Sequence, residues 1–449
     1  MSANKTNPGR SAAASEFRTA STIDEMFLAA LERGDDSFET GRMLVTFKQG
    51  AVESGAKSLG AQGLRVADAR DFEAQAVVLD AVGDADAVVF PEIGVALLGG
   101  PAAQERGLTA QELASDDAIA SVDPEYFMFI DGTAEEYLRT FAQTTINPGD
   151  YLRGFVRAAE TIAKDLAGSV ATEGTSLQEQ TLALGATWGL TACKVPSSSA
   201  TGVGIKVAIL DTGFDVGHPD FAGRPIVSET FVGQPVPDLH SHGTHCTGTA
   251  CGTTSPPGST SRYGIASRSL IHIGKVLTNA GKSVGGSVAA GMNWAVANRC
   301  DVISMSLGVQ KPPQPAYTAA GQSALNNGLL IIAAAGNSGT STGAPANSPT
   351  IFSVAALDPN LTPWPQSDFG KIEIAAPGVD VFSSVPRPVN YGVKTGTSMA
   401  TPHVAGCAAL WAETSSALRG MNLWRQLQVS ARTLPFPRAR VGAGLVQAP

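Results

Sequence analysis

Long apolar runs are missing from this chain of 449 residues, and so is an apolar leader behind Met1. No stretch approaches the ~18–20 consecutive apolar residues that a membrane-spanning helix requires. A secretory signal peptide would need an apolar core near the N-terminus, where this sequence is polar. We therefore expect no membrane partner, and a location either in the cytoplasm or outside the cell by a route without a signal peptide.

Cysteine is scarce, and its number is odd. Most of the cysteines lie in runs of apolar or small residues, which is typical of buried free thiols. An odd and modest number implies no disulfide framework and is compatible with a reducing compartment. The five are Cys193, Cys246, Cys251, Cys300 and Cys407.

Basic residues are few in the N-terminal part of the chain. Residues 1–190 hold 14 Lys and Arg against 29 Asp and Glu, a net charge of −15. Residues 191–449 hold the other 17 Lys and Arg and the other 11 Asp and Glu, a net charge of +6. The whole chain therefore carries −9. A pI near 5.2 and the lack of a basic cluster argue against a nucleic-acid partner. The opposite signs favour docking of one part on the other, although the acidity could also serve solubility alone.

Three short segments that follow one another along the chain each carry one reactive side chain. Asp211 lies in Asp-Thr-Gly, His242 in His-Gly-Thr-His, and Ser398 in Gly-Thr-Ser-Met-Ala-Thr-Pro-His. A hydroxyl is a poor nucleophile unless a base takes its proton and an acid orients that base. Asp, His, Ser is one of the few orders in which such a triad is found. We predict a peptidase in which Asp211 orients, His242 is general base and then acid, and Ser398 attacks.

The local sequence fits these roles. Residues 206–210 form an apolar run typical of a strand buried on both faces, and Asp211 follows at its carboxyl end. His242 begins a run of small residues that we expect to be a helix. Ser398 follows a glycine turn and precedes a helix in which Pro402 would occupy the first turn, where a missing N–H costs nothing.

Asn337 follows another buried strand, predicted over residues 329–335, and comes directly after Gly336. Its amide could donate a hydrogen bond to the tetrahedral oxyanion, beside the backbone N–H of Ser398. Taken alone, Asn337 would be an ordinary turn residue at a strand end; together with the three segments it is predicted to be catalytic.

These motifs resemble the subtilisin-like serine peptidases over about residues 188–448. The resemblance implies an α/β fold with a mostly parallel, seven-stranded sheet between helices. It also implies endopeptidase activity through an acyl-enzyme on Ser398. The same fold could serve a dedicated processing peptidase or a transpeptidase, and a non-catalytic binding module is a weaker alternative. An aspartic protease would need a second Asp-(Thr/Ser)-Gly, which the sequence lacks.

The resemblance further implies where a peptide substrate binds. One edge of the cleft would pair with the substrate backbone as an added strand. The loop around Ser283 would supply the other edge, and a roomy, largely apolar pocket would give broad or hydrophobic preference. The cleft edge is assigned to Ser306, Leu307 and Gly308, and the pocket walls to Ala334, Ala335 and Gly336 with Gly343 and Ala344.

No cofactor is expected. Asp220 matches a position that binds calcium in many relatives, but the companion stretch, residues 252–261, contains no carboxylate. Calcium needs about six oxygen ligands, several of them charged, so that site is expected to be lost or rebuilt. His240, His242, His245, Cys246 and Cys251 match no standard zinc spacing, and His245 and His403 are expected to be structural.

The first 187 residues are expected to precede the catalytic domain as separate units. Residues 1–40 read as a polar tail with a short helix that starts at a Thr22–Glu25 capping box. Residues 41–131 read as a small α+β, ferredoxin-like domain, with one strand predicted over 75–82. Its position resembles that of subtilase propeptides, which inhibit their own catalytic domains; an unrelated accessory domain is the alternative. Residues 132–187 read as a helical linker with a maturation site between Gly168 and Gly185, ahead of a catalytic domain at 188–449.

Overall fold

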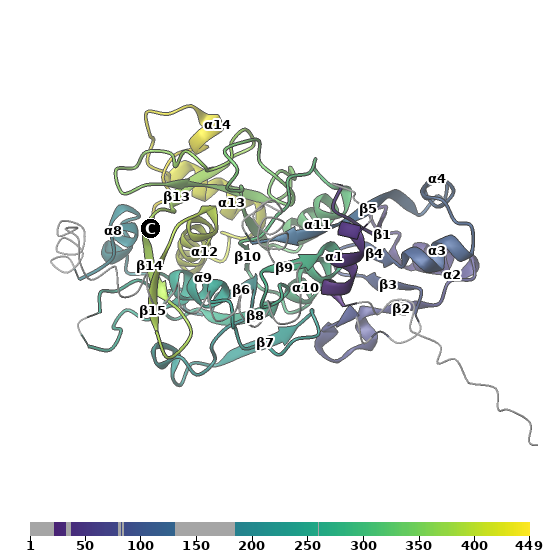
Figure 1. Cartoon of the computed structure of the whole chain (residues 1–449). Coiled ribbons are helices and arrows are strands. Elements are labelled where there is room, and N and C mark those ends of the chain that lie inside the picture. Colours follow the sequence, from purple (N-terminus) through teal and green to yellow (C-terminus); the bar gives the residue numbers. More distant parts are fainter. Residues whose placement is uncertain (1–21, 33–36, 80–81, 83–84, 131–184, 259) are drawn as a thin grey trace, which may run out of the picture.

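The computed structural model describes residues 22–32, 37–79, 82, 85–130, 185–258 and 260–449. Two sheets organise these residues, a large one in the C-terminal part and a smaller one in the N-terminal part (Figure 1). The predicted maturation window, between Gly168 and Gly185, lies outside the described residues except for Gly185 itself. None of the described helices combines the length and apolar character that a bilayer-spanning segment requires.

Seven strands form the large sheet, and every neighbouring pair is parallel. The strands at its centre are almost wholly buried, which explains their near-continuous apolar sequences. In spatial order they are β13 (Ile374–Pro377), β12 (Phe352–Leu357), β11 (Leu330–Ala334), β10 (Val302–Met305), β6 (Lys206–Asp211), β8 (Leu270–Lys275) and β7 (Ile226–Thr230).

Helices cover both faces of this sheet. Side chains alternate along a strand, so Val207 and Ile209 of β6 belong to the core beneath α9 (His242–Cys251) and α12 (Thr397–Thr414). Ala208 and Leu210 instead pack in the core of the opposite helices. Those are α10 (Gly285–Ala297) and α11 (Pro315–Asn326), while α13 (Gly420–Ser430) lies with α9 and α12.

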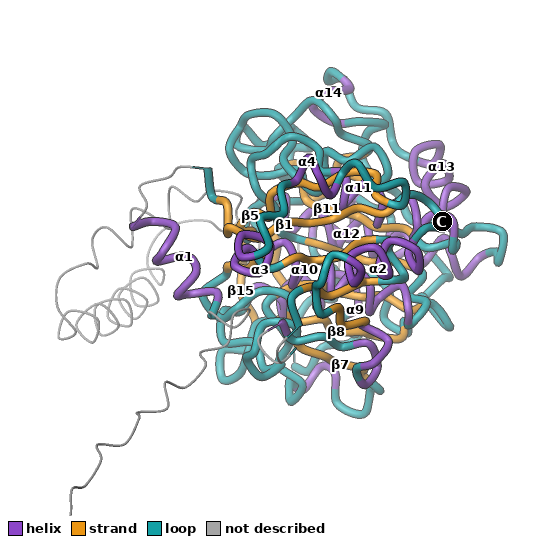
Figure 2. Tube along the Cα trace, turned by 90° about the vertical axis from the view of Figure 1, so that its right-hand side faces the viewer, coloured by secondary structure: helices purple, strands orange, loops and turns teal. Residues whose placement is uncertain are grey.

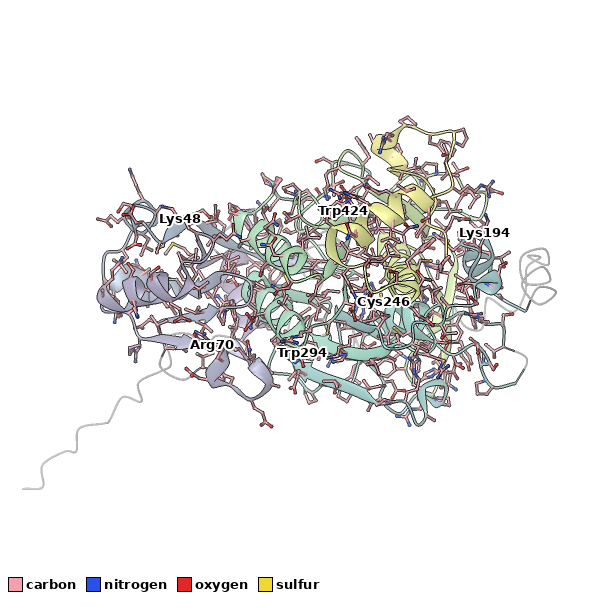
Figure 3. The ribbon with its side chains drawn as sticks, turned by 180° about the vertical axis from the view of Figure 1, so that it is seen from behind. Lys48, Arg70, Lys194, Cys246, Trp294 and Trp424 are labelled. Carbon is pink, nitrogen blue, oxygen red and sulfur yellow. The ribbon has the colours of Figure 1, made fainter. Side chains whose placement is uncertain are left out.

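Short elements complete the larger body. A hairpin of β14 (Val381–Ser384) and β15 (Tyr391–Lys394) packs on α9. The short helices are α8 (Trp188–Ala192), η4 (Val195–Ser197), η5 (Pro219–Phe221) and α14 (Arg438–Val441). All five cysteines are free and buried, as expected. Figure 3 shows Cys246 inside this body, whereas Lys48 and Arg70 belong to the N-terminal part.

The N-terminal sheet has the ferredoxin-like strand order. Its strands are β1 (Glu39–Phe47), β2 (Val66–Asp68), β3 (Ala87–Phe90), β4 (Val95–Leu98) and β5 (Ile119–Phe129), arranged as β2-β3-β4-β1-β5. The helices are α2 (Val52–Ala61), α3 (Gly100–Glu105) and α4 (Ala110–Leu113), with η1 (Ala69–Asp71) and η2 (Glu73–Gln75) between strands. In Figure 2 these helices lie in front of the large sheet.

One strand prediction in this domain is wrong. Residues 75–82 were expected to form a strand, but η2 ends at Gln75 and no strand covers the described residues of that stretch. The backbone of Ala74 and Gln75 adopts positive φ angles of 52° and 58°, which breaks an extended run. The apolar Val77 and Leu79 are buried as irregular chain in the core shared with α10, rather than as a strand.

The two sheets are joined by one short strand. β9 (Lys282–Val284) belongs to the larger body by sequence, yet it pairs antiparallel with the end of β5 as the sixth strand of the N-terminal sheet. The N-terminal helix α1 (Ile23–Glu32) lies against the same place. It begins at the expected capping box, because the Thr22 hydroxyl accepts from the Glu25 N–H and the Glu25 carboxylate accepts from the Thr22 N–H.

Candidate active site

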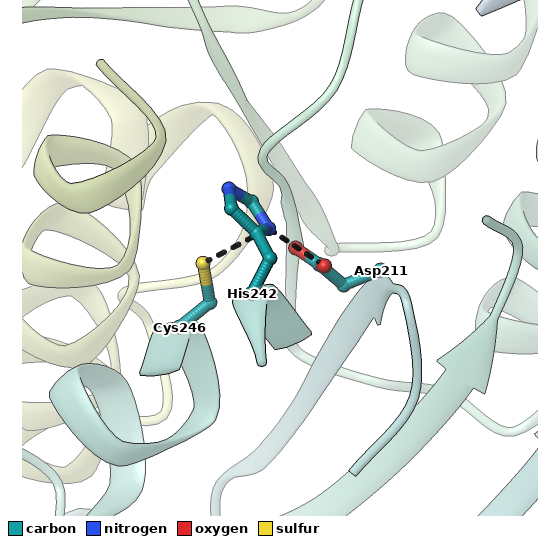
Figure 4. Close-up of side chains that lie close together, drawn as sticks. All are labelled: Asp211, His242 and Cys246. Atoms are coloured by element: carbon teal, nitrogen blue, oxygen red, sulfur yellow. Dashed lines mark hydrogen bonds and ion pairs between the residues drawn. The ribbon is translucent and has the colours of Figure 1, made fainter. Parts of the chain in front are cut away.

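Asp211 and His242 meet where β6 ends and α9 begins. The His242 Nδ1 atom lies 2.8 Å from Asp211 Oδ1 (Figure 4). Asp211 is 1% exposed and His242 is 4% exposed, so the bond is shielded from water. The Thr212 N–H also donates to Asp211 Oδ1, at 2.7 Å. The carboxylate therefore fixes both the orientation of the ring and the proton on Nδ1.

The surroundings adjust the basicity of His242. Burial lowers the pKa of the imidazole, but the Asp211 carboxylate, with a further contribution from Cys246, more than offsets this effect and holds the His242 pKa well above its ordinary value of 6.5. The Nε2 atom is buried and has no hydrogen-bond partner among the described residues. A nitrogen that is basic, oriented and unengaged is what a general base requires.

Ser398 is the second residue of α12 and is 1% exposed. Its hydroxyl is 3.4 Å from the carbonyl oxygen of Ile130 and 3.5 Å from that of Ser306. No hydrogen bond joins it to His242 Nε2, although a triad would make that contact. Such bonds are often long before the substrate is in its reactive position, and here the Ser398 hydroxyl is oriented toward a peptide carbonyl from β5.

The proline near Ser398 lies deeper in its helix than expected. α12 begins at Thr397, so Pro402 is in its interior rather than in its first turn. Proline has no N–H to donate to the carbonyl four residues earlier, which is that of Ser398. The Ser398 carbonyl accepts instead from the Ser306 hydroxyl at 2.9 Å, with the Cys246 thiol at 3.5 Å. These contacts bind the helix start to the cleft edge.

Asn337 lies just beyond β11, next to the start of α12. Its Oδ1 atom accepts from the Thr397 N–H at 2.9 Å and from the Thr397 hydroxyl at 2.8 Å. Because both donors lie on Oδ1, the amide nitrogen is the atom directed elsewhere. The side chain is therefore held by the residue that precedes Ser398, as an oxyanion donor would need to be.

The two predicted cleft edges bind a segment of the same chain. Gly308 exchanges two backbone hydrogen bonds with Phe129, of 3.0 and 2.9 Å. On the other side, Met128 pairs with Ser283, and the Ile130 N–H donates to the Gly281 carbonyl at 3.1 Å. The end of β5 thus lies as a middle strand between the edges, and the carbonyl of Ile130, the residue after β5, lies beside Ser398. Sequence patterning alone did not single out Ile130.

A pocket of about 260 Å³ adjoins Ser398 and gathers the residues assigned to the specificity pocket. Ile130 lies at this pocket, but its Cδ1 atom is directed toward Gly281 and His240. The walls are mostly small or apolar, so the pocket suits an uncharged side chain. They comprise Leu307, Gly308, Val309, Gln310, Ala334, Ala335, Gly336, Gly343, Ala344 and Thr397.

Cys246 is the closest candidate for a metal ligand near the triad residues. Asp211, His242 and Cys246 bring one potential ligand atom each within 4.8 Å of one another. Burial raises the pKa of the Cys246 thiol, whereas zinc binds a thiolate. The His242 Nδ1 atom already bonds to Asp211. This cluster is therefore better explained as a hydrogen-bonded group than as a ligand set.

The two histidines that were expected to be structural, His245 and His403, each bond to a backbone carbonyl. His245 Nε2 lies 2.9 Å from the Val381 carbonyl, and His403 Nδ1 lies 2.8 Å from that of Met399. Burial lowers the pKa of His245 to about 3 and that of His403 to about 4. Both rings are therefore neutral packing residues at ordinary pH.

Asp220 does not fit the calcium role that the family suggests. The Tyr263 hydroxyl donates to its Oδ2 atom at 2.5 Å, and the Tyr391 hydroxyl donates to Oδ1 at 2.9 Å. The Asp220 side chain is fully buried, beside His218. Both carboxylate oxygens are committed to phenol donors, which would repel a cation in the same place. Hydrogen bonds from two tyrosine hydroxyls thus stabilise the Asp220 carboxylate.

Comparison with known proteins agrees with this geometry. The family model described as the subtilase family matches residues 202–444. The chain belongs to the subtilase family. It is 37% identical to "Subtilisin" of Bacillus pumilus over 236 residues, which is 50% of this chain and 83% of that protein. It is 37% identical to "Subtilisin BL" of Lederbergia lenta over 268 residues, 58% of this chain and 96% of that protein.

An "Alkaline protease" of Alkalihalobacillus alcalophilus is also 37% identical, over 60% of this chain and 70% of its own length. This subtilase is accordingly a serine endopeptidase that acts on protein or peptide substrates. The matched region begins at residue 202 and leaves out β1 to β5.

Proposed function

We propose that this subtilase cleaves peptide bonds through an acyl-enzyme on Ser398. His242 takes the Ser398 proton as the oxygen attacks the carbonyl carbon, and then returns it to the leaving amine. Asp211 stabilises the imidazolium that forms. The Asn337 amide and the Ser398 N–H stabilise the oxyanion, and water releases the acyl group while His242 again acts as base. A hydrophobic or broad preference follows from the apolar pocket beside Ser398.

One observation carries this proposal: the carbonyl oxygen of Ile130 lies 3.4 Å from the Ser398 hydroxyl, while a buried carboxylate orients the His242 ring in the same part of the molecule. Replacing Ser398 with Ala should abolish cleavage of a chromogenic peptide and of the chain itself while leaving the fold intact. Labelling of Ser398 by a fluorophosphonate, lost in the variant, gives a second readout. Full activity of S398A would refute the assignment.

We further propose that the N-terminal domain, residues 41–131, inhibits the catalytic domain, residues 188–449, within one zymogen. The support is the strand addition of β5 to both cleft edges. A second contact reinforces it: Glu125 Oε1 accepts from the Gly286 N–H at 2.6 Å, at the start of α10. Glu125 is buried and also bonded to Arg42 at 2.6 Å, so the carboxylate is held in position for this helix end.

The same geometry alters the expected order of maturation. We propose that the first cut falls just after β5, at the Ile130–Asp131 bond, because the Ile130 carbonyl is beside Ser398. A second cut in the linker, between Gly168 and Gly185, would then release a mature N-terminus near Trp188. N-terminal sequencing of fragments from purified full-length protein should find Asp131 before any start in the linker. Fragments that start only in the linker would contradict the first cut.

A further inference from the structure

Another buried carboxylate, that of Asp238, bonds to residues adjacent to Asp211 and to His242 in the chain, and the sequence did not single it out. It is 2% exposed and accepts five hydrogen bonds. Oδ1 accepts from the Thr212 hydroxyl and from the N–H groups of His240 and Ser241, each at 2.9 Å. Oδ2 accepts from the N–H and the hydroxyl of Thr244, at 2.9 and 2.8 Å.

These donors come from both sides of the Asp211–His242 pair. Thr212 directly follows Asp211, the last residue of β6. Ser241 and Thr244 flank His242 at the start of α9. The Thr212 hydroxyl itself accepts from the Gly243 N–H at 2.9 Å. One carboxylate and one hydroxyl therefore connect the strand that carries the acid to the helix that carries the base.

The backbone beside His242 needs such a restraint. Ser241 has a φ of 79°, a left-handed conformation that is unfavourable for a residue with a Cβ atom. Ser241 is also the residue before α9, and its own side chain does not cap the helix. Asp238 caps it instead, since Thr244 is the third residue of α9 and its N–H would otherwise lack a helical partner.

A buried cation adjoins the same group. The Lys275 side chain is fully buried, and its ammonium donates to the Thr212 carbonyl and, at 2.8 Å, to Asn279 Oδ1. Burial lowers the pKa of Lys275 to about 8, against the opposing effect of Asp238 and Asp211. Lys275 thus balances the charges of two buried carboxylates through their common neighbour, Thr212.

We propose that Asp238, through Thr212 and with Lys275 as its counter-charge, is a positioning residue that sets the distance between Asp211 and His242. This inference rests on the proposed role of His242 as the base. The groups that face Asp238 are the Thr212, His240, Ser241 and Thr244 donors, with Lys275 and Asp211 the nearest charges. Loss of the carboxylate would loosen the ring against Asp211 without touching the substrate.

The test replaces Asp238 with Asn in the full-length chain, with Asp301→Asn as the matched control. Asp301 also accepts a backbone hydrogen bond, from the Lys206 N–H at 2.9 Å, but it lies at the opposite end of β6. We expect D238N to lower kcat per titrated active site by about 10- to 100-fold with KM little changed, since small misplacements of catalytic groups cost on this order. The acid limb of its pH profile should move to lower pH. D301N should lower thermal stability only.

A second measurement needs no activity. In a full-length Ser398→Ala background, which keeps the chain uncut, the titration of the His242 ring can be followed by NMR with and without D238N. Thr212→Val, which removes only the connecting hydroxyl, serves as a milder variant. A downward shift of the His242 midpoint in both variants supports the positioning role. Unchanged titration and unchanged kcat, with only stability reduced, would overturn it, whatever the outcome for Ser398.

Discussion

At the scale of single residues, Pro402 shows how one missing donor organises the nucleophile. Because the Ser398 carbonyl receives no helical N–H, it is available to the Ser306 hydroxyl, whose backbone belongs to the cleft edge. The proposed nucleophile and the proposed substrate-binding edge are therefore bonded directly. Gly396, with a φ of 151°, supplies the turn that brings Thr397 and Ser398 to Asn337.

Asn337 gives the first residue-scale prediction. Replacing it with Ala removes the proposed oxyanion donor, so kcat should fall about 10²–10³-fold with little change in KM. The corresponding cost of about 2.7–4 kcal/mol is a value established on a subtilisin. Steady-state kinetics with a chromogenic peptide measure both constants. Unchanged kcat would remove Asn337 from the oxyanion site.

The second residue-scale prediction concerns the pH dependence of activity. A protonated His242 cannot accept the Ser398 proton, so activity is lost as the pH falls below the His242 pKa. Because Asp211 raises that pKa, kcat/KM of the matured enzyme should increase with pH through a midpoint above 6.5. A profile of kcat/KM from pH 5 to 10 locates the midpoint. A midpoint at or below 6.5 would show that Asp211 does not raise the His242 pKa.

The sequence allowed roles to be predicted for residues that lie in short contiguous motifs. It did not allow this for residues whose partners are brought to them only by the fold. Asp211, His242 and Ser398 could be assigned because each lies in a short segment with a chemical reason for its neighbours. Asp238 had no such signal, since its role depends on the fold bringing Thr212 and Thr244 to it. Ile130 is likewise an ordinary apolar residue until β5 is seen between the cleft edges.

At the scale of elements, α1 covers the outer side of the strand that fills the cleft. Phe27 is 1% exposed and packs edge-on against Phe127 at 5.1 Å and Phe129 at 6.0 Å between ring centroids. Lys282 on β9 lies 4.7 Å above the Phe27 ring and 2.6 Å from Asp24 Oδ1. The helix therefore contacts both the inserted strand and the cleft edge that receives it.

This packing predicts that α1 prolongs latency. Phe27→Ala removes a buried aromatic ring, a change that typically costs about 3–5 kcal/mol, so activity should appear sooner after full-length protein is incubated. Asp24→Ala is the matched variant. Asp24 is 59% exposed and its replacement removes no packed ring, although its partner Lys282 is 3% exposed, so its effect on the lag should be smaller than that of Phe27→Ala. Equal lag times for F27A and the parent would exclude α1 from inhibition.

The hairpin of β14 and β15 leads to another element-scale prediction, because it brings Tyr391 to Asp220. Calcium chelators should leave the midpoint of thermal unfolding unchanged. Tyr263→Phe should lower stability by about 1–3 kcal/mol, since it leaves a buried carboxylate short of a donor. A large loss of stability with chelator in the parent protein would show that a cation contributes after all.

Helices that begin at a capping box could be predicted from the sequence. Strands that exist only because another strand pairs with them could not. The capping boxes at Thr22 and Thr109 mark the starts of α1 and α4. The stretch 75–82 has enough apolar residues for a strand, yet its described residues pair with no strand, and Val77 and Leu79 are buried in the core shared with α10. β9 is only three residues long and becomes a strand because β5 pairs with it.

At the scale of the whole molecule, the two parts carry opposite net charge, −15 and +6. Attraction between surface charges is screened over about 10 Å at 0.1 M salt. Salt should therefore shorten the lag before activity appears in incubated full-length protein, more so than it changes kcat of the matured enzyme. Lag times at 0.05 and 0.5 M NaCl measure this. A lag independent of salt would assign the acidity to solubility alone.

If β5 inhibits the catalytic domain as proposed, the first bond within reach of Ser398 is one in the same chain, and breaking that bond would not by itself remove β5. After cleavage the end of β5 would stay bound between the two edges, held by the same backbone hydrogen bonds. Activation would then require that an already active molecule degrade the bound N-terminal domain of another. A sample should therefore show a lag followed by a rapid rise in activity, and the lag should shorten as the protein concentration increases.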